Sequence, residues 1–256
     1  MKDLLAFSKK EMLEQLRSGK LLILGLLFAA LGIMNPAVAK LTPWLLEMLS
    51  DSLAESGMTV TDVTVSALDS WVQFYKNIPI GLIAFVLIES SIFTAEYSTG
   101  TLVLSLTKGL ARYKAVVAKS IMLFILFSAS YWLCYGITYA YTAYYFDNSV
   151  AKNLAFAAFC QWLFGVFVIA LMILFSTLAN SSTGVILSVG SVTLVCYLAG
   201  LLPKVSRYLP TYLCSGNSLI LGASDKESFT AAVLITAGAA VLSLAASVPI
   251  FNKKQL

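Results

Sequence analysis

Residues 154–179 read LAFAAFCQWLFGVFVIALMILFSTLA, a run that contains no charged side chain. About 20 apolar residues are enough for an α-helix to cross the hydrocarbon core of a bilayer. The run is continuously apolar, whereas a strand of a membrane β-barrel alternates between apolar and polar residues. The stretch therefore predicts a transmembrane helix.

Five further stretches have the same character, and they are residues 21–39, 78–95, 115–146, 183–203 and 229–251. The whole chain of 256 residues is 59% hydrophobic and 12% charged, whereas soluble domains are roughly 45–50% apolar and about 25% charged. We therefore expect an all-α integral membrane protein whose six transmembrane helices form a single transmembrane domain, 1–256. The 17 Lys and Arg residues are spread along the chain, which argues against a nucleic-acid-binding protein.

The distribution of Lys and Arg between the loops indicates the orientation of the chain. If both termini are cytoplasmic, the inside segments hold eleven of the 17 basic residues: Lys2, Lys9, Lys10, Arg17, Lys20, Lys108, Arg112, Lys114, Lys119, Lys253 and Lys254. The outside segments hold the rest: Lys40, Lys76, Lys152, Lys204, Arg207 and Lys226. This bias predicts a multi-pass protein of the cell membrane with both termini in the cytoplasm.

Two segments outside the spans are also expected to be helical. In residues 1–20, apolar side chains share one helix face and charged side chains lie opposite: Leu5, Met12, Leu13 and Leu16 against Lys10, Glu11, Glu14 and Arg17. Such a helix can lie flat on the inner leaflet, and the alternative is a plain charged tail. In the outer loop 40–77, Thr42-Pro43 is typical of a helix start, which predicts a helical loop over the outer mouth of the bundle.

The loop 96–119 carries the most specific pattern and reads EYSTGTLVLSLTKGLARYKAVVAK. Its leucines recur at helical spacing, at Leu102, Leu106 and Leu110. Its basic residues fall on another side, at Lys108, Arg112 and Lys119. Gly109 is expected to separate two short helices. A stiff loop with an apolar stripe and a basic rim suits the binding of a soluble partner protein, so the leucines are expected to contact that partner.

This loop resembles the permease subunits of type-2 ABC exporters. The family pattern is a Glu, three residues, Gly-Thr, a leucine-rich stretch, a Pro-x-Ser-Arg turn and a later Lys. The positions that match it are Glu96, Gly100, Thr101, Arg112 and Lys119. The chain departs from it at Gly109, where proline is usual, and at Ala111, where serine is usual. The six-span layout with a flat N-terminal helix is also similar, most of all to permeases of Gram-positive bacteria linked to the export of drugs or antimicrobial peptides.

The resemblance implies that residues 96–119 form a coupling loop that docks into an ATP-hydrolysing subunit. It further implies two copies of that ABC ATPase, and a second permease copy or a related permease beside this chain. ATP and Mg would be bound by the ATPase, because this sequence has no Gly-x4-Gly-Lys-Ser/Thr loop for phosphates. No cofactor is therefore expected in this chain.

Catalysis by this chain is not expected. The sequence has no His, which is the commonest general base and metal ligand. Three of its four Cys residues fall inside predicted spans, so we expect neither a metal site nor a disulfide framework.

Four residues are candidates for a transport pathway: Glu89, Tyr131, Tyr135 and Tyr139. Glu89 is the one charged residue well inside a predicted span, and such residues are often functional. It can instead be an interfacial glutamate that is paired with a neighbour. The tyrosines form an i, i+4, i+8 stripe that suits an amphipathic pathway or, alternatively, packing of the bundle.

The leading hypothesis is therefore the permease of an ATP-driven exporter with an amphipathic substrate such as a drug, a peptide or a lipid-like molecule. Two alternatives remain open. A stand-alone secondary transporter or channel would need charged ion sites within the spans, for which Glu89 is the single candidate. A non-transporting membrane anchor or immunity protein would need no docking partner.

Overall fold

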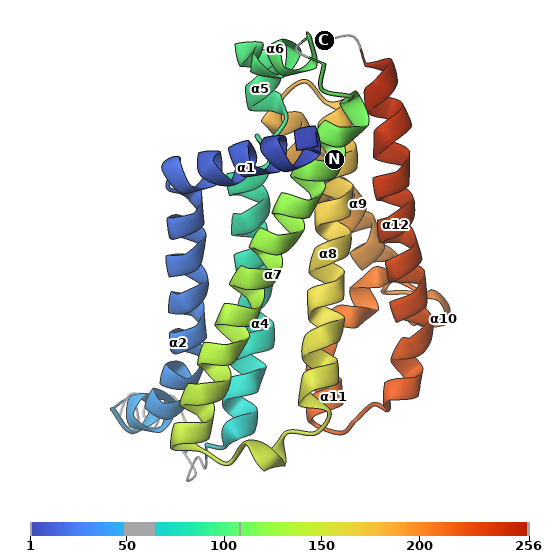
Figure 1. Ribbon diagram of the computed structural model, residues 1–256. Helices are drawn as coiled ribbons and strands as arrows, with labels where there is room; N and C mark the ends of the chain where they lie inside the picture. The colour runs from blue at the N-terminus through green and yellow to red at the C-terminus, as the bar shows by residue number, and fades with distance from the viewer. Residues whose placement is uncertain (1, 49–64, 108, 255–256) are drawn as a thin grey trace.

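The computed structural model describes residues 2–48, 65–107 and 109–254, and its regular elements in these ranges are all helical (Figure 1). The longer helices are α1 (Lys2–Arg17), α2 (Lys20–Met48), α4 (Ala67–Glu89), α7 (Arg112–Tyr145), α8 (Leu154–Leu178), α9 (Ser182–Ala199) and α12 (Thr230–Lys253). Short helices connect them: α5 (Thr94–Thr99), α6 (Thr101–Thr107), η1 (Asn148–Val150), α10 (Pro203–Ser206), η2 (Pro210–Cys214), α11 (Gly216–Ile220) and η3 (Lys226–Phe229). The expected all-α fold is confirmed.

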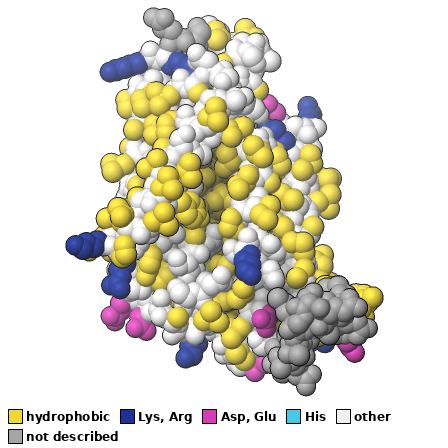
Figure 2. Space-filling view, turned by 180° about the vertical axis from the view of Figure 1, so that it is seen from behind, with side chains coloured by type: hydrophobic (Ala, Val, Ile, Leu, Met, Phe, Trp, Pro, Cys, Tyr) yellow, Lys and Arg dark blue, Asp and Glu magenta, His cyan; other side chains and the backbone are white. Residues whose placement is uncertain are grey.

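Within the described residues, six helices are long and apolar enough to cross a membrane, and they are α2, α4, α7, α8, α9 and α12. Figure 1 shows them as a bundle, with α1 lying across one end. Both chain termini, α5 and α6 lie at this end, which we call the terminal end, and α11 lies at the opposite, distal end. Figure 2 shows hydrophobic side chains over the middle of the surface, as a membrane protein requires.

The bounds of four of these helices lie close to the expected spans, and those of α2 and α4 differ. Helix α2 continues past residue 39 to Met48, and α4 begins at Ala67, well before residue 78. Both ends of the expected outer loop 40–77 therefore belong to long helices. The middle of that loop, residues 49–64, lies outside the described residues.

Local chemistry explains both differences. The Thr42 hydroxyl donates to the carbonyl of Val38 (2.8 Å), so Thr42 bonds back into α2 and does not cap a new helix, and Pro43 lies inside α2. The sequence prediction of a helix start at Thr42-Pro43 was therefore wrong. Helix α4 starts at a capping box, in which the Ser66 hydroxyl accepts from the Leu68 amide and the Asp69 carboxylate accepts from the Ser66 amide.

Helices α2 and α7 approach closely around a proline in α2. Pro36 has no amide hydrogen, which leaves the carbonyl of Gly32 without its usual helical donor. The Thr138 hydroxyl of α7 donates to this carbonyl (3.1 Å) and accepts from the Asn35 amide (3.0 Å). The Asn77 amide of α4 donates to the Asn35 oxygen (2.8 Å). These buried bonds join three spans where water cannot satisfy polar groups.

The centre of the bundle is formed by α7 and α8. Gly165 of α8 lies against the ring of Phe127 of α7, and a Cβ at this position would be 2.2 Å from the ring. Tyr131 is fully buried, and its hydroxyl donates to the Ala158 carbonyl of α8 (2.8 Å). Small residues and internally satisfied hydroxyls are typical of close helix packing in a bilayer.

The segment between α9 and α12 folds back onto the bundle. In η2, Pro210, Thr211 and Leu213 are buried, and the Thr211 hydroxyl donates to the Cys196 carbonyl of α9 (3.3 Å). An apolar groove of about 360 Å³ runs between α4, α8 and α9. Figure 2 shows a hollow among apolar side chains on this side of the molecule.

Candidate coupling site

The face of α1 that lies against the bundle contains Phe7 and two polar residues, and several apolar side chains of α1 point outward. Glu11 and Gln15 are buried, while Met12, Leu13 and Leu16 are exposed. An amphipathic helix lying on a bilayer buries such apolar side chains in the interface. In this protein the opposite face is a protein contact, because it packs against α7 and its side chains bond to residues of α4 and α5 (Figure 1).

A network of ion pairs joins α1, α5 and α7, and we call it the terminal ion network: Lys10, which is 41% exposed, and the buried Glu11, Glu96 and Lys119. The Lys119 Nζ lies 2.8 Å from a carboxylate oxygen of Glu11 and 3.0 Å from one of Glu96. It also donates to the Ile92 carbonyl (3.0 Å) in the turn before α5. The Lys10 ammonium pairs with Glu96 and, at 3.2 Å, with Glu11.

The network lies in a low-dielectric setting. Lys119 is 1% exposed, and the rings of Phe7 and Phe93 cover its ammonium at 5.8 and 5.4 Å. Burial alone would favour the neutral amine of Lys10, but the carboxylates of Glu96 and Glu11 hold its pKa above the ordinary value. Ion pairs of this kind add little net stability, yet removal of one partner leaves a buried charge uncompensated.

The carboxylates of Glu11, Glu14 and Glu96 bring oxygens within 4.8 Å of one another. Lys10 and Lys119 already supply positive charge at this place, since Lys10 also lies 3.3 Å from Glu14. The cluster is therefore an ion-pair network that locks three helices together.

Glu89 is the last residue of α4 and is fully buried beneath α1. One carboxylate oxygen accepts from the Gln15 side-chain amide (2.8 Å) and lies 3.6 Å from the Lys20 ammonium. The structure thus places this pathway candidate at the terminal end of the bundle, against α1 and the start of α2, rather than in the middle of a span.

The predicted coupling loop contains the end of α5 and all of α6, and these two short helices are separated at Gly100, whereas Gly109, the expected separator, lies between α6 and the long helix α7. Gly100 ends α5 with φ +68°, and Gly109 follows α6 with φ +96°. Glycine adopts this conformation without steric cost, so the chain can turn on each side of α6. Thr101 is the first residue of α6, and its hydroxyl lies 3.0 Å from that of Thr99. Figure 1 shows α6 at the outermost part of the terminal end.

The leucine stripe of this loop faces the protein itself. Leu102 is fully buried, and Leu106 and Leu110 are partly buried against the core. The apolar side chains that α6 exposes are Val103 at 38% and Leu104 at 60%. The expectation that this leucine stripe faces outward therefore needs correction. Leu102 and Leu106 of α6, and Leu110 after it, pack against the permease's own bundle, and α6 exposes a second apolar side.

Arg112 ties the first residue of α7 to the end of α12. Its guanidinium donates to the carbonyls of Phe251 (3.2 Å), Asn252 (3.2 Å) and Lys254 (2.6 Å). The Lys254 ammonium in turn donates to the Ala179 carbonyl (2.8 Å) and lies 4.2 Å from the centre of the Tyr97 ring. The last helix is thus fixed to α5, α7 and the turn before α9.

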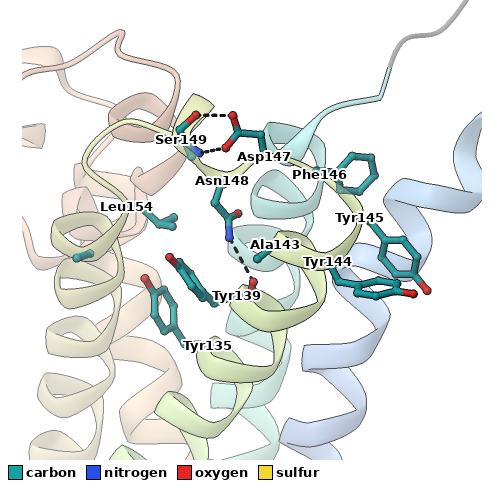
Figure 3. Close-up of a pocket in the computed structure, with 12 residues that line it drawn as sticks. Tyr135, Tyr139, Ala143, Tyr144, Tyr145, Phe146, Asp147, Asn148, Ser149 and Leu154 are labelled. Carbon is teal, nitrogen blue, oxygen red and sulfur yellow. Dashed lines mark hydrogen bonds between the residues drawn. The ribbon is translucent and has the colours of Figure 1, made fainter.

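The three tyrosines of the pathway stripe do not share one environment. Tyr131 is buried in the contact between α7 and α8, as described above. Tyr135 and Tyr139 line a pocket near the distal end, and Figure 3 shows them side by side and facing Leu154. The stripe is therefore divided between helix packing and an open pocket.

Sequence reasoning did not single out Lys10, Glu11, Gln15 or Lys254 as site residues. Glu11 and Gln15 are four residues apart on one face of α1, and this spacing was the available signal. Their partners lie on α4, α5 and α7, far away in the sequence.

A family model described as ABC-2 family transporter protein matches residues 5–208 of the chain. This range includes α1, the coupling loop and the first five spans. No curated protein is a significant match to the chain. The match covers most of the sequence and agrees with the six-helix bundle and the matched motif positions in residues 96–119, so the chain belongs to the ABC-2 family of transporters as a membrane-spanning permease.

Proposed function

We propose that this permease works in an exporter that is driven by a separate ABC ATPase, and that α6 is the element that docks into this ATPase. Two ATPase subunits, each with its own ATP and Mg, would serve two permease subunits. The cargo would be an amphipathic molecule that moves outward.

The proposal rests on how α6 packs: one side of the helix is buried in the bundle and another side is exposed. Its exposed side chains Val103 and Leu104 form an apolar tip, and its other side is packed into the bundle through Leu102. The adjoining helix α5 is held by Glu96 in the terminal ion network. A displacement of α6 by a partner would therefore be passed to α1 and α7 through the packing of Leu102 and through α5.

The excess of Lys and Arg in the loops of one side supports the placement of the terminal end in the cytoplasm. The termini and α6 lie together at this end, where most Lys and Arg residues are expected. Most Asp and Glu side chains visible in Figure 2 lie toward the opposite, distal end. An ATPase that uses cytoplasmic ATP would then meet α6.

The experiment is affinity purification of the tagged chain from its native membrane in mild detergent. We expect an ATPase that contains a phosphate-binding loop to copurify in about equal amount with the permease. The purified permease alone should hydrolyse no ATP, and the complex should. Purification of the chain at full yield without an ATPase would contradict the proposal.

A further inference from the structure

A pocket of about 890 Å³ lies at the distal end of α7, under the turn that leads into α8 (Figure 3). Its lining comes from the distal part of α7, from the turn that follows α7, and from Leu154 and Ala155 of α8. It is remote from the terminal ion network and from α6. Its chemistry is therefore independent of ATPase docking.

One wall of the pocket is a fixed pair of aromatic rings. The rings of Tyr135 and Tyr139 are stacked, with centroids 6.2 Å apart and an interplanar angle of 29°. Trp71 and Trp132 each lie with their ring centroid 5.3 Å from that of Tyr135 and hold it in place. Such a wall offers apolar area at a low cost in side-chain entropy, and the ring faces attract cations.

Asp147 is the charged residue of the pocket, since the other described residues that line it are all uncharged. Its carboxylate accepts from the Ser149 hydroxyl (2.6 Å) and from the Ser149 amide (2.9 Å). These bonds hold the pKa of Asp147 below its usual range, so the carboxylate is ionised at neutral pH. The lining of the pocket therefore carries a net negative charge, and the Lys40 ammonium lies outside the lining, 5.8 Å from the centre of the Tyr145 ring.

We propose that this pocket binds an amphipathic cation, with an ammonium group beside Asp147 and an apolar part along Tyr135 and Tyr139. Figure 3 shows Asp147 in the turn above, well separated from the tyrosine pair. A ligand that contacts both must be elongated and charged at one end. Such a molecule fits the outer interface of a bilayer, where its charge faces water and its tail faces lipid.

The test compares three probes with the same tail on the purified permease in a maltoside detergent: octyltrimethylammonium, octyl sulfate and octyl glucoside. Binding is measured by isothermal titration calorimetry. We expect octyltrimethylammonium to bind at one saturable site per chain, at least about tenfold more tightly than the other two. Equal affinity for the three probes, or the absence of a saturable site, would overturn the proposal.

Variants separate ligand binding from folding. Asp147→Asn keeps an oxygen that can accept from the Ser149 amide, so the melting temperature of the permease should not change. Because the variant removes the charge, it should weaken the binding of octyltrimethylammonium about fivefold. Asp225→Asn removes a charge from another exposed residue, which precedes η3 at the distal end, and this variant should bind the probe as the native chain does. Tyr139→Leu should weaken binding by a similar factor, and Tyr208→Leu should not. Identical affinities for Asp147→Asn and Asp225→Asn would refute the role of the carboxylate.

The ammonium group can come from a zwitterionic lipid or from a free cationic amphiphile, and competition distinguishes them. Displacement of the probe by dihexanoyl-phosphatidylcholine, and not by dihexanoyl-phosphatidylglycerol, would identify a lipid headgroup. Displacement by neither would identify the free amphiphile, and both results support an ammonium site. Equal displacement by both lipids would show recognition of the tail alone and would contradict the proposal.

Discussion

Replacement of Lys119 by methionine is expected to cost about 3–5 kcal/mol of folding free energy, because it breaks a buried ion pair by removing one partner. Methionine has a similar length, so packing is largely kept. The carboxylates of Glu11 and Glu96 would then lose the buried ammonium that pairs with both, and the partly exposed Lys10 would be their remaining partner. The measurement is thermal unfolding of the purified permease in detergent.

Two further variants make this prediction specific to the terminal ion network. Lys253→Met removes the same charge at an exposed position and should melt like the native chain. Glu96→Gln combined with Lys119→Met should be less destabilised than the sum of the two single variants, because both changes act on one network. If the Lys119→Met protein had the same melting temperature as the native chain, the network would not be what holds α1, α5 and α7 together.

Leu104→Asp is expected to weaken binding of the ATPase at least about a hundredfold. Full burial of a leucine is worth about 1.5–3 kcal/mol, and placing a carboxylate in a dry groove costs several kcal/mol more. Since 1.4 kcal/mol corresponds to a factor of ten, a hundredfold loss is a lower bound. Leu104 is exposed in the permease alone, so the change should not affect folding. The measurement is the amount of ATPase that copurifies per permease.

The matched control is Val150→Asp in η1 at the distal end. Val150 is 48% exposed and apolar, as Leu104 is at 60%, but it lies at the other end of the bundle. We expect the Val150→Asp permease to retain its ATPase at the native ratio. If the Leu104→Asp permease retained it equally well, α6 would not be the docking element.

The spans were predictable from the sequence because the membrane imposes one condition on every crossing helix. A continuous apolar run such as residues 154–179 has no other stable place, and α8 begins at the first residue of that run. The ends of α2 and α4 were not predictable from this condition. Proline is favoured at a helix start and disfavoured in a helix interior, so the position of Pro43 inside α2 could not be predicted from local preference.

The coupling loop shows a different limit. The positions Glu96, Gly100 and Lys119 were found from the family pattern, but Glu11 is joined to them by the tertiary fold alone. The apolar pattern of α6 indicated a stripe without indicating its partner, because Leu102 and Leu104 are equally hydrophobic. The structure distinguishes them, since the first is buried in the bundle and the second is exposed.

The most direct measurement of the central claim is photocrosslinking from α6 in intact cells. A benzophenone amino acid at position 104 of the permease should form a crosslink with a protein of ATPase size. Mass spectrometry of peptides from the adduct should identify the crosslinked partner as a protein with a phosphate-binding loop. The same amino acid at position 150 should give no such adduct. Crosslinking of the ATPase from position 150 and not from position 104 would contradict both the docking role of α6 and the cytoplasmic placement of the terminal end.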